Sequence, residues 1–149
     1  MLIGNVDRHG SRVFLLLTHS CTGGLPLGVL ITSNEQEQTI TEALQLWKSI
    51  LPEDCFGGRG VQGPAVFITD DCLSERKALH TAFPGATLLL CTFHILQAVW
   101  RWLWSANHGI QKDHRQSLYM HVKKMIYASS IEDIQEAFNQ ALADQLVVR

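Results

Sequence analysis

One strand–helix–strand run in the middle of the chain constrains the fold most. Ala65–Thr69 (AVFIT) and Ala86–Leu90 (ATLLL) are short, uninterrupted apolar runs, which are typical of strands buried on both faces. Cys72–Phe83 between them has the length of a helix and ends at a Pro-Gly pair. Because the links are short, the pattern predicts a crossover unit with two parallel strands.

A hairpin and a helix are expected upstream. Val13–Ser20 and Leu25–Thr32 are apolar, β-prone runs around a short glycine-containing loop, so they should pair antiparallel. From about residue 35 to 51, apolar residues recur at helical spacing, and Asp54–Gly63 with its glycines reads as a loop. The apolar helical face consists of Ile40, Ala43, Leu44, Trp47 and Ile50.

The helix expected after Cys91 is apolar over most of its circumference. Trp100 and Trp102 lie about 200° apart on a helix of about 3.6 residues per turn, so they cannot both face one flat core. We expect Phe93, Leu96 and Trp100 to be buried on the sheet side.

Trp102 or Trp104 should then be partly exposed in an apolar patch that favours self-association. The alternative is that two C-terminal helices cover both apolar faces. These helices are expected at about Asp113–Ala128 and from Ser130 onward, with Asp133 completing a capping-box-like pair.

The element order therefore favours an α/β fold with a partial RNase-H-like mixed sheet of about four strands, helices on its faces and a C-terminal helical extension. The first strand of such a core is expected to be missing. We divide the chain into a core at residues 1–107 and a truncated helical extension at residues 108–149.

Composition excludes several protein classes. The four cysteines form no CxxC pair, which argues against a disulfide framework or a zinc ribbon. Neither a signal peptide nor an apolar run of about 20 residues is visible, so we expect a nuclear or intracellular, non-secreted protein without a membrane partner. Basic residues cluster in one stretch that either contacts nucleic-acid phosphate or forms an ordinary solvated helix face: Arg101, Lys112, Arg115, Lys123 and Lys124.

Asp70 is the main candidate site residue. It follows an apolar strand directly, where α/β folds place ligands, and a carboxylate there suits Mg²⁺. The alternative is that Asp70 or Asp71 caps the following helix. Both roles are compatible if Asp71 caps and Asp70 points to the site.

Cys91 and His94 form a CxxH pair at a strand-to-helix junction. Two ligands do not make a structural zinc site, so a packing or orienting role is favoured.

The run from Phe67 to Leu103 resembles the central signature of Mutator-like element (MULE) transposases. A strand ends in Thr69-Asp70, a helix runs to Phe83-Pro84, a strand follows, and Cys91 and His94 open a long helix rich in tryptophan and leucine. Leu25–Trp47 resembles the second hairpin strand and the first helix of that family.

The resemblance implies DNA strand cleavage and transfer by a D–D–E triad that holds two Mg²⁺ or Mn²⁺ ions, with transposon-end DNA as the partner. Asp70 matches the second acid, and Cys91 and His94 match the CxxH element, for which we expect a structural or DNA-adjacent role. The first acid would fall near Leu2 or Ile3, which are not acidic, and Asp7 does not replace it. Glu132 and Glu136 come too early for the last acid.

With one of three acids matched, we expect a fragment or derivative of a transposase that is inactive as this chain. The alternatives are a catalytically silent DNA-binding or transcription-related module and a protein-interaction domain.

Overall fold

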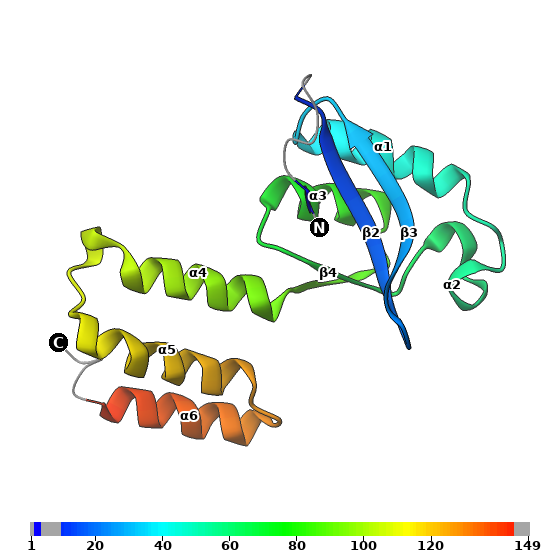
Figure 1. The fold of residues 1–149 in the computed structure, drawn as a ribbon. Coiled ribbons are helices and arrows are strands. Elements are labelled where there is room, and N and C mark those ends of the chain that lie inside the picture. Colours follow the sequence, from blue (N-terminus) through cyan, green and yellow to red (C-terminus); the bar gives the residue numbers. More distant parts are fainter. Residues whose placement is uncertain (1, 4–9, 145–149) are drawn as a thin grey trace. The chain divides into compact units, whose positions relative to one another are not determined.

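The computed structural model describes residues 2–3 and 10–144 and divides into two compact units, Met1–Leu90 and Cys91–Arg149 (Figure 1). The first unit is α/β and the second is helical. Each unit is described by itself below. No helix among the described residues is long and apolar enough to cross a membrane.

The first unit contains an antiparallel sheet with the order β1–β2–β3. Its strands are β1 (Leu2–Ile3), β2 (Arg12–Ser20) and β3 (Gly23–Thr32). The expected hairpin of β2 and β3 is confirmed, with an irregularity in register between Leu16 and Leu17. Pro26 lies opposite Leu17 and has no backbone N–H, so the ladder loses a donor at this point.

The strand β1 corrects the expectation that the first strand is missing. Leu2 pairs with Phe14 and Ile3 pairs with Val13, both antiparallel. Two apolar, β-prone residues are enough to add a short strand to the edge of β2.

The crossover unit is also present. β4 (Val66–Thr69) and β5 (Thr87–Leu90) are parallel neighbours, and α3 (Leu73–Ala82) connects them. The expected single mixed sheet is wrong, because β4 and β5 form a separate two-stranded sheet. Among the described residues, no strand forms backbone hydrogen bonds with both β2 and β4.

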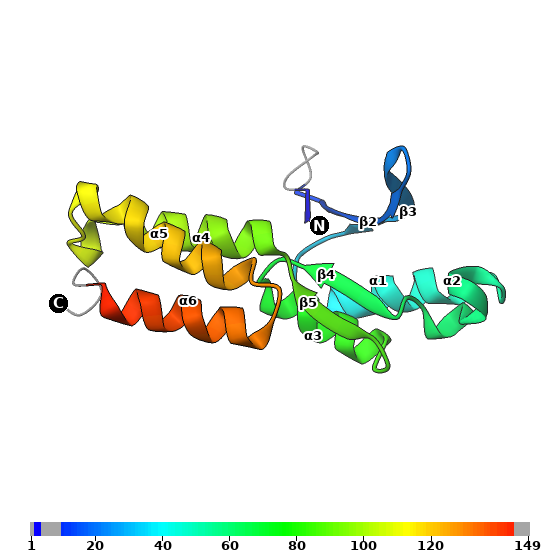
Figure 2. The same ribbon diagram turned by 90° about the horizontal axis from the view of Figure 1, so that it is seen from below.

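The core of the first unit lies where α1 (Glu37–Ser49) and α3 meet the strands (Figure 2). Trp47 packs against Phe83 with ring centroids 5.9 Å apart, and Lys48 Nζ donates a hydrogen bond of 2.8 Å to the carbonyl of Ala82. The expected loop contains two short helical turns, α2 (Cys55–Gly58) and η1 (Gly60–Gln62). The core residues of this unit are Phe14, Leu30, Ile40, Leu44, Trp47, Ala78, Leu79, Ala82 and Phe83.

The strands β4 and β5 are less buried than their apolar sequences predict. Phe67 packs against the core, whereas its neighbour Ile68 is 67% exposed. Exposed and covered residues alternate along both strands, as expected when helices cover one face only. The prediction of strands buried on both faces is therefore wrong.

The second unit contains three long helices, α4 (Thr92–Trp104), α5 (Lys112–Ile126) and α6 (Ile131–Ala143), with the short turn η2 (Ala106–His108) after α4. α5 packs against both α4 and α6. The Ser130 hydroxyl accepts a hydrogen bond of 3.0 Å from the backbone N–H of Asp133, as the capping pattern predicts.

The tryptophan-rich helix α4 fits the predictions in part. Leu96 is buried and Trp102 is 54% exposed, as expected. Phe93 and Trp100 were expected to be buried, but Phe93 is 64% exposed and Trp100 is also exposed. The alternative in which the C-terminal helices cover both faces is wrong as well, because Trp100, Trp102 and Trp104 are each at least 40% exposed.

Gly28 in β3 should be essential to this core. A Cβ at this position would lie 2.6 Å from Nε1 of the buried Trp47, so Gly28→Ala must displace the indole. We expect the first unit to lose about 1–3 kcal/mol of stability. Hydrogen exchange of the α1 amides measures the free energy of opening.

Gly24→Ala is the matched control in the same strand, because its Cβ would meet nothing closer than Leu17 Cδ1 at 4.0 Å. It should change stability by no more than about 0.5 kcal/mol. Equal losses in the two variants would show that Trp47 does not pack over Gly28.

Candidate functional site

Asp70 lies in the turn between β4 and α3. Its Oδ1 atom accepts a hydrogen bond of 3.0 Å from the backbone N–H of Cys72, which closes the turn into the helix. Thr69 before it is buried, and its hydroxyl donates a hydrogen bond of 2.8 Å to the carbonyl of Asp70. Both bonds hold the Asp70 backbone and one carboxylate oxygen in place at the end of the strand.

Of the two aspartates that could cap the helix, Asp70 is the one whose side chain bonds to the start of α3. Asp71 was one of the two candidates for capping the helix, but its side chain is 85% exposed and forms a long ion pair of 3.7 Å with Arg76. Cys72 occupies the N-cap position without a side-chain capping bond. Asp70 forms the turn instead, because its carboxylate lies two residues before the Cys72 amide, the spacing of an Asx turn.

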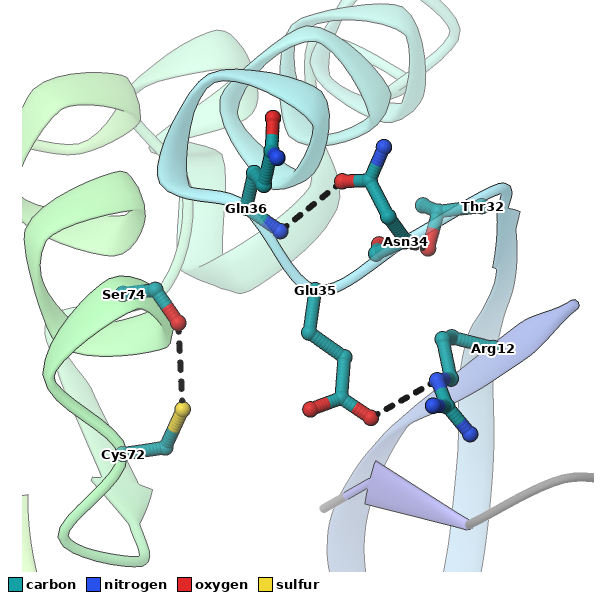
Figure 3. A network of polar contacts seen from close by, with 7 residues as sticks. All are labelled: Arg12, Thr32, Asn34, Glu35, Gln36, Cys72 and Ser74. Carbon is teal, nitrogen blue, oxygen red and sulfur yellow. Dashed lines mark hydrogen bonds and ion pairs between the residues drawn. The ribbon is translucent and has the colours of Figure 1, made fainter. Parts of the chain in front are cut away.

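Asp70, Cys72 and Glu75 bring three potential ligand atoms within 4.8 Å of one another. Glu75 lies in the first turn of α3 and is only 7% exposed. The Cys72 thiol lies 3.2 Å from the Ser74 hydroxyl (Figure 3). Two carboxylates and a thiol form a donor set for a divalent cation: the oxygens suit Mg²⁺ or Mn²⁺, and the sulfur favours softer ions.

Cys72 and Glu75 were not among the site residues expected from the sequence. The signal was present in their spacing, because a residue two positions after Asp70 lies at the helix start and one five positions after it lies in the first helical turn. Such a spacing is common without function, so the cluster is distinguished only by the proximity of its three donor atoms in the structure.

A second polar network lies around the loop that joins β3 to α1 (Figure 3). Arg12 Nε and Glu35 Oε1 form an ion pair of 2.9 Å, which ties the start of β2 to this loop. The Asn34 side chain accepts a hydrogen bond from the Gln36 amide, and Thr32 donates one to the Asn34 carbonyl. These contacts fix the entry into α1.

Cys91 and His94 lie in the second unit, at the start of α4. Cys91 is the N-cap residue, and the His94 ring packs edge-on against Phe93 with centroids 5.4 Å apart. Among the described residues no third donor joins this pair in a metal-binding cluster. The His94 Nδ1 atom is buried and has no hydrogen-bond partner within the described part of the chain.

The basic stretch divides into two kinds of residue. Arg115 is half-buried; it donates two hydrogen bonds, of 3.0 and 2.8 Å, to the Ile110 carbonyl and lies over the Trp104 ring at 4.6 Å. Its role in this unit is therefore structural. The exposed members of the stretch are Arg101, Lys112, Lys123 and Lys124.

A family model described as MULE transposase domain matches residues 14–98, which is more than half of the chain. The chain belongs to the MULE transposase domain family. The matched segment begins in β2 and ends within α4, so it includes Asp70, Cys91 and His94. No match was found among curated proteins.

Asp70 should contribute to stability independently of any ligand. Asp70→Ala removes the acceptor of the Cys72 amide and should lower the stability of the first unit by about 1–2 kcal/mol. Asp70→Asn keeps an oxygen at this position and should retain most of that stability. Hydrogen exchange of the α3 amides measures the difference.

Asp71→Ala is the control, since it removes only an exposed ion pair that contributes about 1 kcal/mol at most. A larger loss for Asp71→Ala than for Asp70→Ala would contradict the assignment of the turn to Asp70.

Proposed function

We propose that this chain is a transposase-type domain that acts on DNA, with Asp70 as a metal-ligand position of its site. The observation that carries the proposal is the convergence of Asp70, Cys72 and Glu75 within the segment that matches the family. We also propose that the protein is located in the nucleus.

We also propose that the first unit is an RNase-H-like core. Three antiparallel strands followed by a parallel crossover pair are the elements of such a core in the expected order.

Asp70 and Glu75 would hold a divalent ion through their carboxylates, with Cys72 as a third donor. When bound, such an ion polarises a phosphoryl oxygen of DNA and stabilises developing charge. The protein contributes rigidity, because the Asp70 carboxylate is held by the Cys72 amide and Glu75 is buried in the first turn of α3.

This site has fewer carboxylates than the three acids of the family's triad. β1 is the strand where the first acid is expected, and it consists of Leu2 and Ile3. Glu75 adds a second carboxylate beside Asp70, but from the same strand-to-helix turn. We therefore propose that this chain does not cleave DNA by itself.

Metal binding should be weak and centred on the cluster. We expect Mn²⁺ to bind with a Kd on the order of millimolar, because most of its coordination is left to water. Paramagnetic broadening of amide NMR signals should be strongest around Asp70–Glu75 and should decrease in Asp70→Asn and Glu75→Gln. Asp71→Asn should leave it unchanged, and the opposite order would exclude the cluster as the site.

Cleavage is tested on the same preparations with supercoiled plasmid and Mg²⁺ or Mn²⁺. We expect no nicked product above a metal-free control. Nicking that is abolished by Asp70→Ala would show that the other acids are supplied by residues not identified above.

A protein-interaction role is the second candidate, and the exposed aromatic side chains of α4 favour it. Large exposed apolar residues often mark interaction surfaces. Phe93 and Trp102 are both more than half exposed, so the chain should self-associate.

Sedimentation velocity should show association that increases with concentration and is reduced by the double substitution Phe93→Gln and Trp102→Gln. Arg101→Gln on the same helix is the control and should have little effect. A single monomeric species at all concentrations would contradict this role.

A further inference from the structure

The Cys72 thiol distinguishes the cluster of Asp70, Cys72 and Glu75 from a site made of carboxylates alone. Its Sγ atom and one oxygen of each carboxylate lie within 4.8 Å of one another. Mg²⁺ takes oxygen ligands, whereas thiolate ligands select softer ions such as Zn²⁺. The third donor therefore decides which divalent ion the cluster prefers.

The turn from β4 into α3 presents all three donors within residues 70–75. Asp70 Oδ1 accepts the hydrogen bond from the Cys72 N–H, and a carboxylate has a second oxygen, so Asp70 can bind an ion without opening the turn. Asp70 and Cys72 are both partly exposed, which lets an ion enter from solvent. Three protein ligands leave the fourth tetrahedral position to water, as in open zinc sites.

The Ser74 hydroxyl holds the Cys72 sulfur in place. The two side-chain atoms lie 3.2 Å apart, and Figure 3 shows the thiol directed toward Ser74. Either group can donate while the thiol keeps its proton, whereas toward a thiolate the hydroxyl is the donor. Hydrogen bonds from neighbouring groups orient metal ligands, and the thiol proton passes to solvent when the sulfur binds an ion.

We propose that this cluster binds Zn²⁺ in preference to Mg²⁺ and Mn²⁺, through the Cys72 sulfur and one oxygen each of Asp70 and Glu75. Zn²⁺ binds a given set of nitrogen, oxygen and sulfur ligands more tightly than Mn²⁺, and a thiolate adds to this difference. Cys72 is thus the residue that determines which ion is bound. The inference rests on the proposed metal-ligand position at Asp70, but it requires no cleavage activity.

Competition between Zn²⁺ and Mn²⁺ tests the preference in the full chain. Mn²⁺ broadens the amide NMR signals around Asp70–Glu75, and diamagnetic Zn²⁺ removes this broadening where it displaces Mn²⁺. We expect Zn²⁺ to bind about a hundredfold more tightly, so free Zn²⁺ at about one tenth of the free Mn²⁺ concentration should remove about 90% of the broadening. In Cys72→Ser the preference should fall at least about tenfold, and the same Zn²⁺ concentration should remove no more than about half.

Co²⁺ reports directly whether sulfur is a ligand, because a thiolate bound to Co²⁺ gives a charge-transfer absorption in the near ultraviolet. We expect this absorption in the unchanged chain and its loss in Cys72→Ser. Serine is favoured at the N-cap position that Cys72 occupies, so the variant should retain α3. Cys91→Ser is the matched control, because Cys91 is also a helix N-cap residue but lies outside the cluster, and it should keep the absorption.

The outcomes separate this inference from the proposed function. Mn²⁺ broadening at the cluster that Zn²⁺ does not displace would overturn the zinc preference and leave the metal-ligand role of Asp70 intact. A Co²⁺ absorption that persists in Cys72→Ser, or that is lost in Cys91→Ser, would overturn it in the same way. Absence of both the Mn²⁺ broadening and the Co²⁺ absorption would remove the metal site altogether, and the proposed function with it.

Discussion

The contact between Trp47 and Phe83 organises the first unit. Phe83 ends α3 and packs on Trp47 of α1 at 5.9 Å and on Phe67 of β4 at 5.3 Å, so it joins the helices to the parallel strands. Two glycines make room for these rings: a Cβ at Gly28 would meet Trp47, and one at Gly63 would meet Phe83 at 2.5 Å. The position of Asp70 depends on this packing, because Asp70 lies between β4 and α3.

The second constraint on the fold of the first unit is which of its strands pair with one another. Helices α1 and α3 contribute side chains to the core of the first unit, but among the described residues β2 and β4 share no ladder. The antiparallel and the parallel strands therefore form two sheets, although their order along the chain suits one. Helical packing can close a core around a gap in a sheet, since side-chain burial does not require the strands to share a ladder.

The candidate site combines a structural and a chemical role in one residue. The Oδ1 atom of Asp70 accepts a hydrogen bond from the backbone N–H of Cys72. The Asp70 carboxylate also lies within 4.8 Å of the Cys72 thiol and of the Glu75 carboxylate. Stability and metal binding therefore separate only in a variant such as Asp70→Asn, which retains the acceptor and removes the charge. The cluster lies within the segment that matches the MULE transposase domain. Because two of its three donors are carboxylates, a divalent metal ion is the first ligand to test.

The sequence by itself determined the long helices, the strands other than β1, their order, the parallel pairing of β4 with β5 and the position of Asp70 after a strand. These features follow from side-chain periodicity and short connections, which act over a few residues. Only the tertiary structure decided that β2 and β4 do not pair, that Asp70 rather than Asp71 closes the turn, that Glu75 joins the cluster, and that Phe93 and Ile68 are exposed. The strand pairing and the exposure of Phe93 and Ile68 depend on which distant surface covers a strand edge or a side chain, and local spacing does not encode that. The Asp70 turn and the Glu75 cluster are local in sequence, but the same spacing is compatible with several side-chain arrangements.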